Sequence, residues 1–267
     1  MKKSFRFFLA AVCITALFAA CKKNTAATGL PEAITQAERA KIAALGFTSS
    51  NAYKSDGGYI VEGDIFLRPE DLDRVPDRIN LVRVGNEEQY RTTNLVCPAT
   101  RTLKVRYTGS FGSLSIALNA AIARYNALPA TCQLRFVRVG PGTAADITLT
   151  EVTNVPYVAS SGFPSGCNPF NAIYYNTAYT GWNANTLATI IAHELGHCIG
   201  FRHTDWMNRA FSCGGSPVNE GTVPVNAIQI PGTPATPDPN SWMLACIGNG
   251  MNRPFNANDI TALDYLY

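Results

Sequence analysis

The stretch that decides the fold is "IAHELGHCIGFRHTDW", residues 191–206. It contains all three histidines of the 267-residue chain, which are His193, His197 and His203. Because the first two are four residues apart, a helix would place both on one face, where two imidazoles can bind one Zn²⁺. Gly200 favours the left-handed turn that commonly ends helices. Such a turn would bring His203 back to the same point, so the stretch predicts a three-histidine metal site.

The spacing H-E-x-x-H-x-x-G-x-x-H resembles the zinc signature of metzincin peptidases. The resemblance covers about residues 96–267 and includes "NSWMLA", where Ser241 and Met243 match the Met-turn beneath the zinc. The last residues, "FNANDITALDYLY", are similar to the closing helix of matrixin-type catalytic domains. The chain also resembles astacins, and most of all the bacterial lipoprotein metzincins described as dual-action metallopeptidases.

The resemblance implies an α/β (α+β) fold. Its parts would be a twisted, mostly parallel sheet with an antiparallel edge strand, an active-site helix, and an irregular C-terminal subdomain with a closing helix. The residue patterns agree with this fold, because alternating and helical periodicities follow one another along the chain. Strands are predicted over 101–107, 132–139, 145–152 and 171–178, and helices over 113–128 and 183–200.

The activity that the resemblance implies is zinc-dependent cleavage of internal peptide bonds in a polypeptide substrate. Glu194 would take a proton from the water that Zn²⁺ activates and pass it to the leaving amine. The antiparallel strand would pair with the substrate by β-augmentation, and we assign this role to Ala172, Ile173, Tyr174 and Tyr175. A plain edge strand is the alternative for these residues. The loop 214–240 would form the wall of the pocket beyond the scissile bond.

Ala245 departs from the pattern of the relatives, and Cys198 lies next to a predicted metal ligand. Astacins and serralysins place a tyrosine two residues after the Met-turn methionine, whereas this chain has Ala245. We therefore expect no tyrosine at the metal. Cys198 follows the second histidine and, by helix geometry, would face away from the metal. We predict that it takes part in a disulfide and is not a metal ligand.

The N-terminus has the features of an export signal over residues 1–20. A basic start is followed by the apolar run 7–20, and "LFAAC" resembles a bacterial lipobox in which Cys21 is lipidated. Ordinary signal cleavage nearby, with no lipid, is the alternative. The protein is expected outside the cytoplasm, either anchored by lipid in the cell envelope (at the outer membrane or cell surface) or secreted. Membrane contact would then come only through the lipid.

Residues 21–95 are predicted to form a lipid-anchored tether and a pro-segment, ahead of a catalytic domain over 96–267. Within this segment, "YIVEGDIFL" resembles the pro-segment motif of astacins, whose aspartate binds the zinc. The resemblance makes Asp64 a candidate latency switch. A hairpin with an exposed Asp64 is the alternative, and a cysteine switch through Cys97 is a rival.

The cysteines agree with export. Apart from Cys13 and Cys21 the chain has six, Cys97, Cys132, Cys167, Cys198, Cys213 and Cys246. An even number in an oxidising compartment suggests three disulfides, with buried free thiols as the alternative. Cys97 and Cys132 each precede a predicted strand, and neighbouring parallel strands start side by side. We therefore predict a Cys97–Cys132 disulfide.

The composition is that of a globular protein, with 46% hydrophobic and 15% charged residues. The net charge of +3 comes from three basic residues of the export signal, which leaves 19 basic and 19 acidic residues elsewhere. No basic patch argues for nucleic acid, and a monomer is expected. Two other functions stay open: a zinc-containing surface binding lipoprotein with little or no peptidase activity, and, more weakly, an exopeptidase.

Overall fold

The computed structural model describes residues 31–45, 47–73, 89–221, 226–234 and 236–267. The predicted signal peptide, Cys21 and most of the tether lie outside the described residues. In the part that is described, no helix has both the length and the apolar character needed to cross a membrane.

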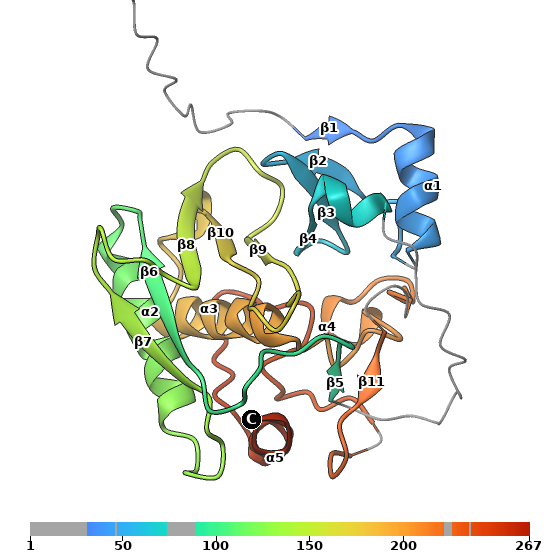
Figure 1. The fold of residues 1–267 in the computed structure, drawn as a ribbon. Helices are drawn as coiled ribbons and strands as arrows, with labels where there is room; N and C mark the ends of the chain where they lie inside the picture. The colour runs from blue at the N-terminus through green and yellow to red at the C-terminus, as the bar shows by residue number, and fades with distance from the viewer. Residues whose placement is uncertain (1–30, 46, 74–88, 222–225, 235) are drawn as a thin grey trace, which may run out of the picture.

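A nine-stranded mixed sheet forms the centre of the molecule, in the order β1-β2-β3-β4-β9-β10-β8-β6-β7 (Figure 1). In chain order its strands are β1 (Glu32–Ala33), β2 (Tyr53–Ser55), β3 (Gly58–Val61), β4 (Ile65–Leu67), β6 (Thr102–Tyr107), β7 (Arg135–Val139), β8 (Ile147–Val152), β9 (Ala159–Ser161) and β10 (Ala172–Asn176). Strands β5 (Tyr90–Arg91) and β11 (Ile228–Gln229) pair with each other in a second, small sheet. The helices are α1 (Gln36–Ala44), α2 (Gly112–Asn126), α3 (Ala184–Ile199), α4 (Ala210–Cys213) and α5 (Ala257–Leu266), with single 3₁₀ turns η1 (Pro69–Asp73) and η2 (Thr177–Tyr179).

One half of the sheet, made of its four longest neighbouring strands, is parallel, as predicted. Strands β10, β8, β6 and β7 run in one direction, and α2 and α3 lie together against them (Figure 1). The Tyr125 hydroxyl on α2 donates to the Ala192 carbonyl on α3 over 2.8 Å. Helix α3 is buried almost all round because the sheet covers one side and the C-terminal subdomain the other. This burial fixes the helix that carries the histidine motif.

The C-terminal subdomain is irregular apart from short elements and the closing helix α5. Asn256 caps α5 by accepting from the Asn258 and Asp259 amides, which explains why the helix begins where the sequence predicts. Tyr267 at its end donates through its hydroxyl to the Ile199 carbonyl of α3. The closing helix therefore holds the end of the active-site helix, and the predicted fold class is confirmed.

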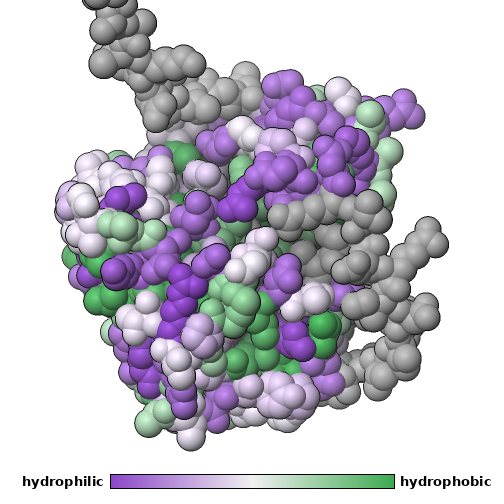
Figure 2. Space-filling model, viewed as in Figure 1, coloured by the Kyte–Doolittle hydropathy of each residue, from purple (hydrophilic) through white to green (hydrophobic). Residues whose placement is uncertain are grey.

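The first four strands form an antiparallel meander that continues the sheet. It joins the parallel half through β4, which pairs with β9 in parallel at Ile65 and Ser161. The residues between 34 and 72 have a core of their own, in which Ile42, Leu45 and Ile65 are fully or almost fully buried. Seen from the side of Figure 1, the surface over β1, β2 and α1 is mostly hydrophilic (Figure 2).

The prediction for the antiparallel strand was wrong. Residues 172–176 form β10, which pairs in parallel with β8 and so belongs to the sheet interior. The antiparallel strand is β9, whose three residues pair with β10 on one side and touch β4 on the other. Ile173, Tyr174 and Tyr175 therefore pair on both sides, and Ala172 pairs with Thr148 of β8. A three-residue strand of small side chains, Ala-Ser-Ser, gave no detectable periodicity.

The predicted Cys97–Cys132 disulfide was also wrong. Cys97 is bonded to Cys167, whose carbonyl also accepts from the Cys97 amide. Cys132 is a free thiol, 1% exposed, because it turns into the core beneath the sheet. The error came from the path of the chain before β6 and not from the strand order. β6 and β7 are indeed neighbours, but the chain before β6 folds back toward the loop that precedes β10.

The prediction of three disulfides, one of them with Cys198, was only partly right. Cys213 pairs with Cys246, so the six cysteines that follow Cys21 form two disulfides and not three. Cys198 is free and fully buried, with its sulfur facing the Ala172 carbonyl 3.8 Å away. It does face the sheet and not the histidines, as helix geometry requires, but it has no disulfide partner.

Candidate active site

Helix α3 and the turn that follows it bring the three histidines together. His193 and His197 lie one turn apart on α3, and the helix ends at Gly200, whose φ of 113° is left-handed. A Cβ atom at Gly200 would lie 2.8 Å from Leu95 and 2.9 Å from the Asn94 carbonyl oxygen. Both the backbone angle and the space therefore require glycine, and the chain turns back so that His203 faces the helix.

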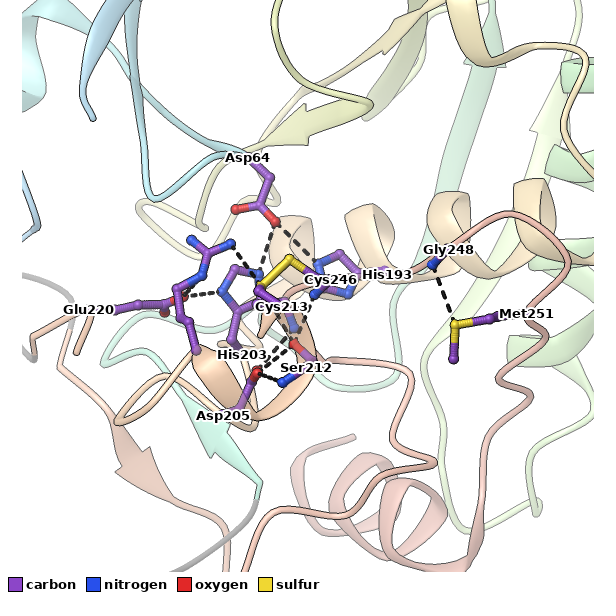
Figure 3. The surroundings of a disulfide bond; sticks show 12 residues. Asp64, His193, His203, Asp205, Ser212, Cys213, Glu220, Cys246, Gly248 and Met251 are labelled. Carbon is purple, nitrogen blue, oxygen red and sulfur yellow. Dashed lines mark hydrogen bonds and ion pairs between the residues drawn. A yellow bond between two sulfur atoms is a disulfide. The ribbon is translucent and has the colours of Figure 1, made fainter. Parts of the chain in front are cut away.

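The metal-binding atoms of four side chains converge. One ligand atom from each of Asp64, His193, His197 and His203 lies within 4.8 Å of the others. The Nε2 atoms of His197 and His203 are 3.1 Å apart, and Asp64 Oδ2 is 3.0 Å from His203 Nε2 and 3.8 Å from His193 Nε2. Figure 3 shows Asp64 above His193 and His203. Three nitrogens and one oxygen in this arrangement match the ligand number and chemistry of a tetrahedral Zn²⁺ site.

Hydrogen bonds fix which nitrogen of each ring can bind a metal. The Nδ1 atoms of His193, His197 and His203 lie 2.9, 2.8 and 2.6 Å from the Trp242 carbonyl, the Phe201 carbonyl and Glu220 Oε1. Carbonyl and carboxylate oxygens can only accept, so each Nδ1 carries a proton and donates it. Each Nε2 is then left facing the cluster, which is the tautomer that metal binding through Nε2 requires.

The electrostatics also favour a cation. Burial and the two other rings lower the pKa of His197 well below its usual value, so this imidazole is neutral and has a lone pair to offer. Burial would lower the pKa of His203, but Asp64 and Glu220 outweigh it and raise that pKa. Burial would raise the pKa of Asp64, yet His203 and His193 hold it well below its usual range. The cluster is therefore a buried place where positive charge is stabilised by two carboxylates.

Glu194 lies beside the cluster and is held by the antiparallel strand. Its side chain is buried at 2% exposure, and its Oε2 accepts from the Ser161 hydroxyl over 2.6 Å. Burial and the nearby charge of Asp64 raise the pKa of Glu194 well above its usual value, against the lowering effect of Ser161. A carboxylate with a raised pKa next to a metal site is suited to exchange protons near neutral pH.

Asp64 reaches the histidines from the turn between β3 and β4. Glu62 and Gly63 have φ angles of 56° and 94°, so the backbone makes a tight left-handed turn that points the next side chain inward. The Asp64 carbonyl accepts from the Ser161 amide over 3.0 Å, which fixes the turn against β9. Asp64 Oδ1 is buried without a hydrogen-bond partner among the described residues, which suits a carboxylate that also faces a cation.

Met243 lies beneath the histidine helix and is fully buried. A Cβ atom at Gly196 would lie only 2.6 Å from Met243 Sδ, so the glycine between the first two histidines makes room for the methionine. The preceding residue, Trp242, provides the carbonyl that orients His193. The turn thus supports the metal site from below, and Met243 is not among the four converging ligands.

A cavity of about 240 Å³ opens next to His193 and Glu194. The predicted wall, residues 214–240, contributes none of its described residues to the lining. The wall of the cavity on this side comes instead from the Met-turn and the segment that follows it. The lining residues of that segment are Trp242, Leu244, Ala245, Cys246, Ile247 and Arg253. The prediction for the loop is therefore not confirmed by its described residues, and the Cys213–Cys246 disulfide holds the later segment beside the histidines (Figure 3).

The comparisons with known proteins place this arrangement in a family. A family model described as dual-action HEIGH metallo-peptidase matches residues 61–267, well over half of the chain. The chain belongs to this family. It is therefore a metallopeptidase by family, and the matched region begins just before Asp64.

Two solved structures of myroilysin are similar to this metallopeptidase. One match has 17% identity and a TM-score of 0.34, and it covers 43% of this chain and 54% of that chain. The other has 14% identity and a TM-score of 0.44, and it covers 90% of this chain and 99% of that one. In the first match the chain thus spans about half the length of its relative. No curated protein matches the chain.

Sequence reasoning missed Glu220, the carboxylate that orients the third histidine of this metallopeptidase. Glu220 binds His203 Nδ1 through Oε1, and its Oε2 lies 3.3 Å from the buried Arg202 guanidinium. Glu62 lies 3.6 Å from the same guanidinium, and Arg209 Nε is 3.5 Å from Glu220. Glu220 stands in a loop rich in Gly and Pro, 17 residues after the histidine that it contacts. Only the three-dimensional turn brings them together.

Proposed function

We propose that this chain is a zinc-dependent endopeptidase, made as a latent precursor and exported to the cell envelope. The observation that carries the proposal is the convergence of three histidine Nε2 atoms beside a buried glutamate, with every Nδ1 proton already committed elsewhere. His193, His197 and His203 would hold the zinc, and Met243 would support them from beneath.

When bound at this site, zinc acidifies a water molecule and polarises a substrate carbonyl. Glu194 acts as the general base for the attacking water and then returns the proton to the leaving amine. Ser161 keeps the Glu194 side chain on the cleft side by its 2.6 Å hydrogen bond. The apolar wall of Trp242 and Leu244 limits water in the cleft, which strengthens these charge interactions.

Latency would come from the segment before the catalytic domain. Asp64 would be a further ligand when zinc is bound, and it would then exclude the reacting water. The same turn places β4 against β9, so the backbone edge next to Glu194 is covered. Since β4 runs parallel to β9, it occupies this edge in the direction opposite to an antiparallel substrate. Release of β4 would free both the metal and the edge.

The substrate would then pair with β9. Ala159–Ser161 is the strand nearest Glu194, and β-augmentation at its free edge would present a peptide bond to the histidines. Antiparallel pairing would place the N-terminal part of the substrate near Ser161 and the C-terminal part near Ala159. This strand takes the role that the sequence assigned to residues 172–175.

Export and anchoring complete the proposal. The signal over residues 1–20, lipidation at Cys21 and a polar tether over residues 22–30 would anchor the enzyme in the cell envelope, at the outer membrane or the cell surface. The two disulfides support an oxidising compartment. Mass spectrometry of the mature N-terminus would show a diacylated or triacylated Cys21, whereas an unmodified N-terminus elsewhere would argue for simple secretion.

The test of the catalytic role compares residues 22–267 with the Glu194→Ala variant on a mixed peptide library. The parent should cut slowly because Asp64 keeps it latent, the Asp64→Ala variant should cut faster, and the Glu194→Ala variant should bind zinc without cutting. Glu70→Ala, which removes an exposed glutamate of η1, serves as the matched control and should cut like the parent. If parent, control and the Asp64→Ala variant all bind zinc and none cuts, the chain is a zinc-containing binding protein.

A further inference from the structure

The cavity beside His193 and Glu194 is mostly apolar but contains a buried cation. Its apolar walls include Ile190 on α3 and Leu244 and Ile247 after the Met-turn. Arg253 also lines it and is 7% exposed. A guanidinium at the wall of an apolar cavity next to a catalytic glutamate is unusual, because a buried charge is costly unless it is paired.

Arg253 has fewer partners than a buried arginine needs. Its Nη1 donates to the Cys246 carbonyl over 2.8 Å, and its Nε is buried with no hydrogen-bond partner in the described parts of the chain. None of the ion pairs found between described residues includes Arg253. Its main-chain amide donates to Thr189 Oγ1 and its carbonyl accepts from Arg124, so the backbone at this position is fixed.

The acidic group whose charge acts on this arginine, Asp205, does not contact it directly. Asp205 influences Arg253 only through space, and its own oxygens accept from the Ala245 amide over 3.0 Å and from the Ser212 hydroxyl over 2.6 Å. The second arginine that lines the cavity, Arg209, differs because it lies 3.5 Å from Glu220. Arg253 therefore lines the cavity without a direct ion-pair partner among the described residues.

The direction of β9 tells which part of a substrate meets this cavity. Residues 156–159, at the start of β9, line the cavity, whereas Phe163, beyond its end, packs edge-on against His197. A chain paired antiparallel to β9 would run from the Phe163 side toward the cavity. The residue that follows the scissile bond would then place its side chain between Ile190 and Leu244, within reach of Arg253.

We propose that this cavity receives the side chain of the residue that follows the scissile bond and that Arg253 selects glutamate or aspartate there. The inference rests on the proposed peptidase function and adds the substrate class to it. The methylene groups of glutamate would pack on the apolar walls, while its carboxylate would form charge-assisted hydrogen bonds with the guanidinium. The same walls would exclude the water that otherwise screens the pair.

The test uses the zinc-loaded chain 22–267 carrying Asp64→Ala, with peptides that differ only in the residue after the cut bond. Glutamate should exceed glutamine in kcat/KM by about tenfold or more, since a buried charge-assisted pair is strongly favoured over its neutral analogue. Arg253→Met should abolish this ratio, and Arg253→Lys should keep part of it. Arg138→Met, which removes an arginine of β7 that neither lines the cavity nor contacts Arg253, should leave it unchanged.

The outcomes separate this inference from the proposed function. If the library is cut in a Glu194-dependent way without enrichment of acidic residues after the bond, Arg253 has a purely structural role and the inference is overturned while the peptidase stands. Acidic enrichment before the bond would equally overturn the placement. If nothing is cut in a Glu194-dependent way, both fail. The glutamate–glutamine ratio of the unsubstituted Arg253 protein decides the matter even where Arg253→Met unfolds.

Discussion

Asp64 Oδ2 lies 3.0 Å from His203 Nε2, although 139 residues separate the two along the chain. The carboxylate comes from the β3–β4 turn and the imidazole from the turn after α3, so the contact joins the N-terminal meander to the histidine cluster. Because Oδ2 is also 3.8 Å from His193 Nε2, Asp64 closes the open side of the cluster. A substrate and this side chain cannot use that position together.

Replacement of Asp64 by alanine should therefore raise the peptidase activity of the full-length chain. Loss of a contact that contributes about 1.4 kcal/mol to the closed state would give a tenfold increase, and we expect at least that. Initial rates on a quenched peptide measure it. Asp73→Ala, in the same segment but at the surface, is the control. Equal activity of Asp64→Ala and the parent would exclude the switch.

Glu220 should control how tightly the site binds zinc. Its carboxylate orients His203 through Nδ1, and loss of such an outer partner typically lowers metal affinity about 10- to 100-fold. Zinc competition against a chelating dye would show this loss for Glu220→Ala and a smaller one for Glu220→Gln. Glu62→Gln alters the same Arg202 network without touching the histidine, and should change affinity less. Parent-like affinity of Glu220→Ala would contradict the assignment.

Gly196 should be intolerant of even one methyl group. A Cβ atom there would lie 2.6 Å from Met243 Sδ and 3.2 Å from Trp242 Nε1, so Gly196→Ala must displace the methionine. Overpacking of this kind destabilises by about 1–3 kcal/mol, which urea unfolding would detect. Gly181→Ala, where no atom lies within 4 Å of the new Cβ, is the control. Additive effects of Gly196→Ala and Met243→Ala would show that the two positions are not coupled.

Thiol counting should find two free cysteines in the chain 22–267. Cys132 and Cys198 are buried, so neither should react with a thiol reagent in the folded protein. Unfolding without a reductant should expose two thiols, and reduction should then release four more. Absence of reactive thiols after unfolding would instead support the three disulfides that the sequence suggested.

The histidine helix and the parallel strands could be predicted because their information is local. The i,i+4 pair, Gly200 and the Asn183 cap lie within one helix, and the strands from Thr102 to Val152 alternate clearly. Asp64 was found through a short motif. What escaped depends on contacts between distant segments. Strand β9 has too few residues to show a period, and the pairing of Cys97 with Cys167 depends on how a loop folds back. Glu220 and Arg253 are ordinary charged residues in the sequence, and only packing brings Glu220 to His203 and Arg253 to the cavity.

The central claim is that one zinc ion at the three histidines, with Glu194 as base, performs the hydrolysis. The most direct measurement is zinc titration of chelator-stripped chain 22–267 carrying Asp64→Ala, with peptide cleavage followed at each step and Glu194→Ala beside it. We predict that cleavage rises linearly and saturates at about one equivalent of zinc, while the Glu194→Ala chain binds the same amount and stays silent. Cleavage that persists without zinc, or in the Glu194→Ala chain, would contradict the account.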